Sequence, residues 1–206
     1  NLTEGSVELI DTGSTARGTN MIGDGDFDLL MRVDKTILLN PEKLNALKEA
    51  LKEALADAEK HDMTSSGDFR YKKVNIPGLD IPVDIDITFA QKTNKTTYST
   101  EMALNERLAS IQNDSPEQYA LVAANIIMAK KILKAKGIYK KIGSVGASEH
   151  GGFGGIGVEN WILQNGGSFK KAIDTFLEVA NDVESYDEFK KRYPIFDFGF
   201  NHREGK

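Results

Sequence analysis

Four short apolar segments in the first ninety residues, each bounded by polar or turn-forming residues, predict β-strands. The first two are Val7–Asp11 and Phe27–Val33, which lie on either side of a glycine-containing turn. Phe69–Ile76 and Ile81–Phe89 follow, joined by a turn at Pro77-Gly78. Together they predict a small mixed sheet.

A helical repeat of leucines separates the two pairs of strands. The leucines are Leu44, Leu47, Leu51 and Leu55. Before them, Asn40-Pro41-Glu42 provides an N-cap, a proline at the first helical position and an acid in the first turn. We therefore expect a long helix that runs to about His61, with the helices on one face of the sheet.

The second half of the chain has helical patterning only. Ser115–Gln118 is a capping box with a proline at the first helical position, and Gly137 is a natural helix stop. Further helices are expected at about Gly155 to Asn165, after the N-cap Ser168, and from a second capping box at Ser185–Glu188 to before Pro194. The predicted fold class is α/β (α+β): a small mixed sheet over residues 1–92, then an all-helical domain over 98–206.

Composition restricts the protein class. The chain has 206 residues, of which 40% are hydrophobic, so it can bury one sizeable core or two modest ones. The formal net charge of -5 argues against a protein dedicated to coating nucleic acid, but it does not exclude an RNA substrate. There is no cysteine, which excludes disulfides and thiolate zinc sites.

The sequence also bears on location and completeness. No apolar run approaches the roughly 20 residues of a membrane span, and no signal-peptide pattern is present, so a cytoplasmic protein is expected. The chain starts at Asn1 without methionine and ends shortly after the apolar segment Phe196–Phe200. We expect a fragment of a larger protein, with an N-terminal helix missing and the helical domain truncated.

Asp26-Phe27-Asp28 places two carboxylates on one face of a strand, with the phenylalanine pointing into the core. Two adjacent carboxylates repel each other and need a cation. Hard oxygen ligands suit magnesium, which takes its remaining ligands from water and substrate phosphates. Upstream, Ser14 and the backbone N–H groups of the turn at Gly13 can hold phosphate oxygens.

A third acid is expected from the strand that carries Asp84 and Asp86, since acids in an otherwise apolar strand are costly to bury without partners. Three carboxylates can bind two Mg²⁺ ions for phosphoryl transfer, with Mn²⁺ as a possible substitute. Each element alone has a simpler interpretation: a plain turn, an exposed strand edge, a solvated outer face. Their occurrence together and in order favours chemistry.

Gly13–Thr19, Asp26-Phe27-Asp28 and the later Val83-Asp84 resemble the polymerase-beta nucleotidyltransferase superfamily. Downstream, the chain is similar to the central domain of archaeal-type (class I) CCA-adding tRNA nucleotidyltransferases. The segments that carry this similarity are Lys130–Tyr139, Gly152–Gly155 with Glu159, and Gly166–Phe169.

The resemblance implies roles for individual residues. Gly13, Ser14 and Arg17 would contact the triphosphate, and Lys130 and Tyr139 would bind the triphosphate and ribose side of the nucleotide. Asp26, Asp28 and Asp84 would be the catalytic metal ligands. Asp84 is preferred to Asp86 because the family has an aromatic residue five positions after its acid, as Phe89 is here.

The expected reaction transfers a nucleoside monophosphate from ATP or CTP to a hydroxyl, most simply an RNA 3′ end such as that of a tRNA. Two alternatives stay open: a synthase of 2′-5′ oligoadenylates or cyclic dinucleotides, and an inactive nucleotide- or RNA-binding module. The oligomeric state is left open.

Two further patterns favour structural roles. Gly152–Gly157 matches G-x-G-x-x-G, but neither the strand before it nor an acid at a strand end, which a dinucleotide-binding site requires, is predicted. Trp161 lies on an apolar helix face and is expected in the core.

Overall fold

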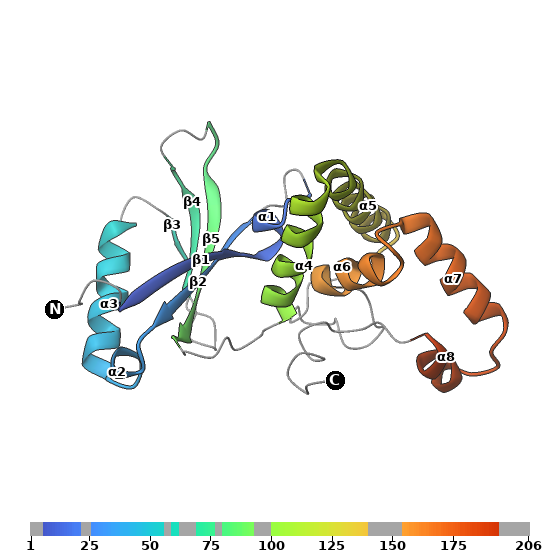
Figure 1. Cartoon of the computed structure of the whole chain (residues 1–206). Coiled ribbons are helices and arrows are strands. Elements are labelled where there is room, and N and C mark those ends of the chain that lie inside the picture. The colour runs from blue at the N-terminus through green and yellow to red at the C-terminus, as the bar shows by residue number, and fades with distance from the viewer. Residues whose placement is uncertain are drawn as a thin grey trace. The chain divides into compact units, whose positions relative to one another are not determined.

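The computed structural model describes residues 6–21, 26–55, 59–61, 69–76, 80–92, 100–139 and 154–193. The chain divides into two compact units, residues 1–97 and 98–206, which Figure 1 shows as a sheet-containing unit and a helical unit. Over the described ranges, no helix is both long enough and apolar enough to cross a membrane.

The first unit contains a five-stranded sheet in the order β1-β2-β5-β4-β3. Neighbouring strands are antiparallel except for β2 and β5, which are parallel. The strands are β1 (Val7–Thr12), β2 (Asp26–Val33), β3 (Glu59–His61), β4 (Phe69–Val74) and β5 (Val83–Gln91). The parallel pair brings together two segments that lie almost sixty residues apart in the chain.

The described part of the first unit also contains the helices α1 (Gly13–Ala16), α2 (Lys35–Leu38) and α3 (Pro41–Ala54). The side chain of Asn40 caps α3 by accepting a hydrogen bond from the backbone N–H of Lys43, as its position before proline predicted. The expected extension of this helix to His61 is wrong. Glu59–His61 instead forms β3, because it pairs with β4 at the edge of the sheet.

The core of the first unit lies on one face of the sheet. Met31 and Val33 of β2 and Ile85 and Ile87 of β5 are buried there, and Leu47 of α3 packs in the same cluster. Because successive side chains of a strand point to opposite faces, the acidic residues of β2 and β5 lie on the face away from this core.

The described part of the second unit contains the helices α4 (Thr100–Asp114), α5 (Pro116–Ala135), α6 (Gly155–Gln164), α7 (Phe169–Asn181) and α8 (Tyr186–Arg192). The hydroxyls of Ser115, Ser168 and Ser185 each accept a backbone N–H three residues later, so the three predicted caps are confirmed. Helix α4 was not predicted. Gly154 and Gly155 of the G-x-G-x-x-G pattern cap and begin α6; the residues before them lie outside the described ranges.

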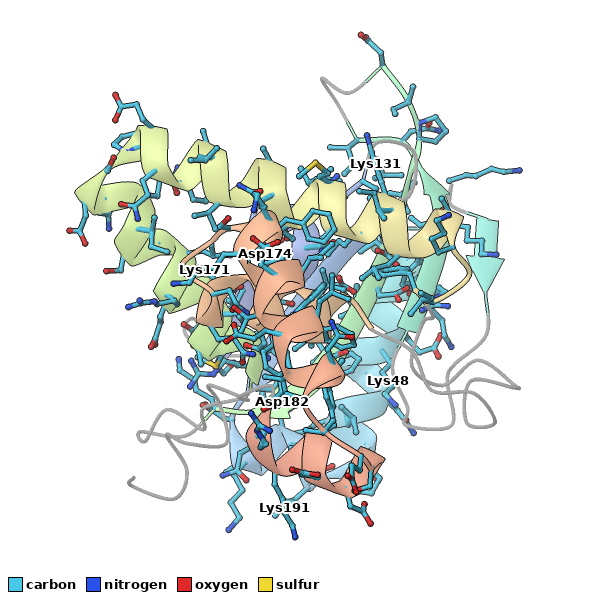
Figure 2. All side chains as sticks on the ribbon, turned by 90° about the vertical axis from the view of Figure 1, so that its right-hand side faces the viewer. Lys48, Lys131, Lys171, Asp174, Asp182 and Lys191 are labelled. Atoms are coloured by element: carbon cyan, nitrogen blue, oxygen red, sulfur yellow. The ribbon has the colours of Figure 1, made fainter. Side chains whose placement is uncertain are left out.

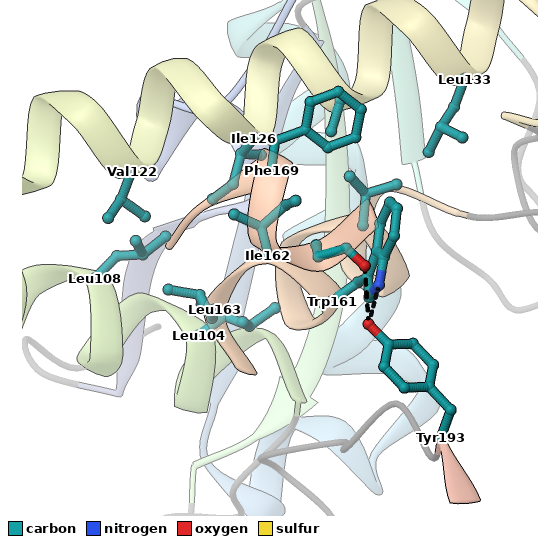
Figure 3. Packing of buried hydrophobic residues seen from close by; sticks show 13 residues of the cluster. Leu104, Leu108, Val122, Ile126, Leu133, Trp161, Ile162, Leu163, Phe169 and Tyr193 are labelled. Carbon is teal, nitrogen blue, oxygen red and sulfur yellow. Dashed lines mark hydrogen bonds between the residues drawn. The ribbon is translucent and has the colours of Figure 1, made fainter. Parts of the chain in front are cut away.

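Trp161 is in the core of the second unit, as expected. Its indole N–H donates to the hydroxyl of Tyr193 at 2.8 Å, and Leu104, Leu108 and Ile126 pack in the same cluster (Figure 3). Lys131, Lys171 and Asp174 are exposed on α5 and α7 (Figure 2).

Candidate active site

The parallel pairing of β2 with β5 places four acids side by side. Asp26 is opposite Asp84 and Asp28 is opposite Asp86. All four side chains lie on the face away from the core, since they occupy alternate positions of their strands. The sheet register therefore converts two separate Asp-x-Asp sequences into one acidic surface.

Three of these acids form a potential metal site. Asp26, Asp28 and Asp86 each offer a carboxylate oxygen, and the three oxygens lie within 4.8 Å of one another. All three residues are half-buried. Two unit charges 4 Å apart near a protein surface repel by about 4 kcal/mol, so such a cluster favours a bound cation. An all-oxygen, partly open ligand set fits Mg²⁺.

Asp84, which the sequence spacing favoured as the third acid, is not in this group. Its Oδ1 accepts a hydrogen bond from the backbone N–H of Lys73 at 3.2 Å. Lys73 has a φ of 51° and lies where the pairing of β4 with β5 shifts register between Tyr71 and Val74. This irregularity supplies Asp84 with a backbone partner, whereas Asp86 stays with Asp26 and Asp28.

Arg70 of β4 binds the third acid of the cluster, a contact that the sequence analysis missed. Its Nε donates to Asp86 Oδ1 at 2.6 Å, and its Nη2 donates to Oδ2 of the same carboxylate. The hydrogen bonds with Asp86 raise the pKa of Arg70; desolvation opposes this, and the charges of Asp86, Asp26 and Asp28 add to it. The pair could not be predicted from the sequence, because it depends on the antiparallel register that places Arg70 opposite Asp86.

The turn between β1 and β2 is tightly packed against the acids. Gly13 has a φ of +72°, and a Cβ there would lie 1.9 Å from Asp28 Oδ2. The hydroxyls of Thr12 and Thr15 donate to the backbone carbonyls of Asp28 at 2.9 Å and Asp26 at 2.6 Å. Glycine at position 13 is therefore required sterically, and the turn and strand β2 form one structural element.

The residues predicted to bind phosphate differ in accessibility. Ser14 is half-buried in α1, next to Gly13, whereas Arg17 is 4% exposed. The carbonyl of Ser14 accepts a hydrogen bond from the backbone N–H of Thr19 at 2.9 Å, which closes the turn. Contacts of these side chains with a triphosphate stay predictions.

Lys130 of the second unit is buried, unlike its lysine neighbours. Its side chain is 2% exposed, and its Nζ lies 2.6 Å from Oε1 of Glu159, which is fully buried. A Cβ built on Gly155 would lie 3.2 Å from the Tyr139 hydroxyl and 4.0 Å from Lys130 Nζ. The structure thus brings Lys130, Glu159 and Tyr139 together. Lys130 is therefore not an exposed helix lysine, in contrast to Lys131.

Comparison with known proteins gives the fold. The chain matches no protein-family model and no curated protein. Among solved structures, it is similar to the Cid1 poly(U) polymerase with MgATP, at a TM-score of 0.51 and 18% identity, over 78% of this chain and 43% of that one. It is also similar to the CdnC:HORMA complex of E. coli MS115-1, at a TM-score of 0.53 and 16% identity, over 85% of this chain and 56% of that one.

The chain thus spans about half the length of these two proteins. At such low identity the likeness shows the fold and leaves substrates and partners open. The chain has the fold of the nucleotidyltransferases, a small mixed sheet followed by helices, which is the fold class predicted from the sequence.

Proposed function

We propose that the protein is a magnesium-dependent nucleotidyltransferase that moves a nucleoside monophosphate from a nucleoside triphosphate to a hydroxyl and releases pyrophosphate. The observation that carries this proposal is the convergence of the Asp26, Asp28 and Asp86 carboxylates beside the Gly13–Ser14 turn. The nucleotidyltransferase fold supports it.

The residues of the first unit would divide the work as follows. Asp26 and Asp28 would hold the cations, and Asp86 would complete the ligand set and orient the acceptor hydroxyl. When bound, Mg²⁺ would lower the pKa of that hydroxyl and neutralise charge on the leaving pyrophosphate. Mn²⁺ prefers the same oxygen ligands and is proposed as a substitute. Ser14 and the backbone at Gly13 would hold phosphate oxygens.

Residues predicted for nucleotide binding complete the proposal. Lys130 and Tyr139 would contact the triphosphate and ribose, as the resemblance to CCA-adding enzymes implies. A lysine ammonium group is a compact charge that suits a phosphate partner, and the Glu159 carboxylate holds that of Lys130 in place. Arg17, which is buried, would contact the triphosphate from the turn between β1 and β2.

The proposed acceptor is an RNA 3′ end. The similarity to the Cid1 poly(U) polymerase supports an RNA acceptor. A tRNA acceptor and CCA addition, with ATP and CTP as substrates, rest on the sequence resemblance alone.

A second candidate keeps the chemistry but changes the acceptor. The similarity to CdnC, which groups with the cyclic dinucleotide synthases, favours a synthase of signalling nucleotides to the same degree. An inactive binding module is the third possibility, and the intact acid cluster argues against it.

Incubation with each labelled nucleoside triphosphate and Mg²⁺, with and without RNA oligonucleotides, distinguishes the candidates. Lengthened RNA supports the RNA acceptor; soluble oligonucleotides formed without RNA support the signalling synthase. If no nucleotide gives a product, the inactive binding module is the candidate that remains.

Two matched variants test the site itself. Asp86→Ala removes a proposed metal ligand and should reduce turnover by about 10³-fold or more, because metal contacts contribute several kcal/mol to the transition state. Asp84→Ala makes the same change two residues away on the same face of β5 and should reduce turnover by less than about tenfold. The reverse result would make Asp84 the third acid. Full turnover in Asp28→Ala would refute the site.

A further inference from the structure

Arg70 occupies both oxygens of one acid in the proposed metal site. Its Nε and Nη2 donate to the two carboxylate oxygens of Asp86, which is the planar two-pronged geometry of strong arginine–carboxylate pairs. A divalent cation bound by Asp26, Asp28 and Asp86 needs at least one of those oxygens. The carboxylate has lone pairs for both partners, but the guanidinium and a divalent cation repel each other, so Arg70 and the cation compete for Asp86.

The charges of the cluster explain why Arg70 is bound to Asp86 when no metal is present. The three carboxylates carry three negative charges, with ligand oxygens within 4.8 Å of one another. Arg70 is a positive charge placed opposite Asp86 in the antiparallel register of β4 and β5. It offsets part of the mutual repulsion of the acids and holds the Asp86 carboxylate in one orientation.

Arg70 is also able to move. Its side chain is 37% exposed, whereas that of Asp86 is 20% exposed. A guanidinium with over a third of its surface in water can turn outward without passing through the core, and solvent reduces the cost of breaking this partly exposed pair. By contrast, the buried Lys130–Glu159 pair has no such freedom.

We propose that Arg70 is a stand-in cation for the metal site: it neutralises and orients Asp86 in the metal-free protein and gives up at least one Asp86 oxygen when a divalent cation binds. The inference rests on the proposed metal site of the preceding section. It makes Arg70 a positioning residue that sets the metal concentration at which the site fills.

Binding of Mn²⁺ to the whole chain without nucleotide tests the inference, with free Mn²⁺ counted by electron paramagnetic resonance and Mg²⁺ used as the competitor. Arg70→Gln removes the competing charge, so the Mn²⁺ Kd should fall by about tenfold. The same variant should unfold at a lower temperature than the wild type in EDTA, because the carboxylate repulsion is no longer offset. A purely structural ion pair would lower the melting temperature but leave the Kd unchanged.

Arg192→Gln is the matched control. Arg192 pairs with Asp182 at 2.7 Å, and its side chain is 43% exposed in the second unit. This variant should leave the Kd at the wild-type value.

Arg70→Lys provides a second measurement if the glutamine variant does not fold. A lysine keeps the charge but loses the two-pronged contact, so its Kd should lie below that of the wild type. An unchanged or weaker Mn²⁺ affinity in the folded Arg70 variants overturns the inference alone. If Asp28→Asn binds Mn²⁺ as tightly as the wild type does, the metal site fails, and the inference falls with it.

Discussion

At the scale of single residues, the conformation of Gly13 determines where the Asp28 carboxylate can lie. The backbone there is left-handed, and the Asp28 carboxylate fills the space that a side chain would need. Thr12 and Thr15 fasten the same turn to the backbone of β2. One glycine therefore links the proposed phosphate-holding turn to the proposed metal ligand.

Gly13→Ala should weaken Mn²⁺ binding by at least about tenfold, because the new methyl group would displace the Asp28 carboxylate. It should also lower the free energy of unfolding by about 1–3 kcal/mol through backbone strain. Gly166→Ala is the matched control: Gly166 has a φ of +69°, but nothing lies within 4 Å of its Cβ position. The control should have a lower free energy of unfolding because of backbone strain, but it should bind Mn²⁺ normally in the same titration. Equal metal affinity in both variants would contradict the steric argument.

At the scale of elements, the buried Lys130–Glu159 pair joins α5 to α6. Two charges removed from water pay a desolvation cost that their attraction barely offsets, so such a pair is a poor source of stability. We attribute its presence to the proposed nucleotide contact of Lys130, which needs the lysine charge. The Tyr139 hydroxyl close to the start of α6 supports that view.

Glu159→Gln should lower the free energy of unfolding by about 3–5 kcal/mol, because it leaves the Lys130 charge buried without its carboxylate. Replacing both residues by methionine should restore most of the stability, as measured by urea unfolding. The double variant should nevertheless lose affinity for nucleoside triphosphate, measured by calorimetry. Normal nucleotide affinity in the stable double variant would show that the pair is structural only.

At the scale of the molecule, each of the two compact units has its own core. The sheet unit is built around residues such as Val33 and Ile85, and the helical unit around Ile126 and Trp161. Within the described ranges, each buried hydrophobic cluster draws its residues from one unit. The two units are therefore expected to differ in local stability.

Ile126→Ala creates a cavity at a fully buried position and should destabilise the helical unit by about 2–5 kcal/mol. Hydrogen exchange measured by mass spectrometry on the whole chain should become faster in α5 and α6, while β2 and β5 keep their protection. Val33→Ala, also at a fully buried position but in the sheet unit, should give the opposite pattern. Faster exchange across both units in either variant would mean that the chain unfolds as one body.

Local patterns determined most of the secondary structure. The caps at Asn40, Ser115, Ser168 and Ser185 could be read directly, because a side-chain oxygen three residues before a helical N–H is a local arrangement. The strand β3 could not, since three residues carry too weak a pattern and form a strand only through pairing with β4.

The candidate site, too, could be predicted only in part from the sequence. The sequence by itself determined that Asp26 and Asp28 share a face and that a glycine-serine turn precedes them, because strand alternation is local. Which acid of β5 joins them was decided only by the tertiary structure. Sheet register and the irregularity at Lys73 assign Asp84 to a backbone amide and Asp86 to the cluster, and the same register brings in Arg70. Such contacts depend on how distant segments pair, and no spacing within one segment encodes them.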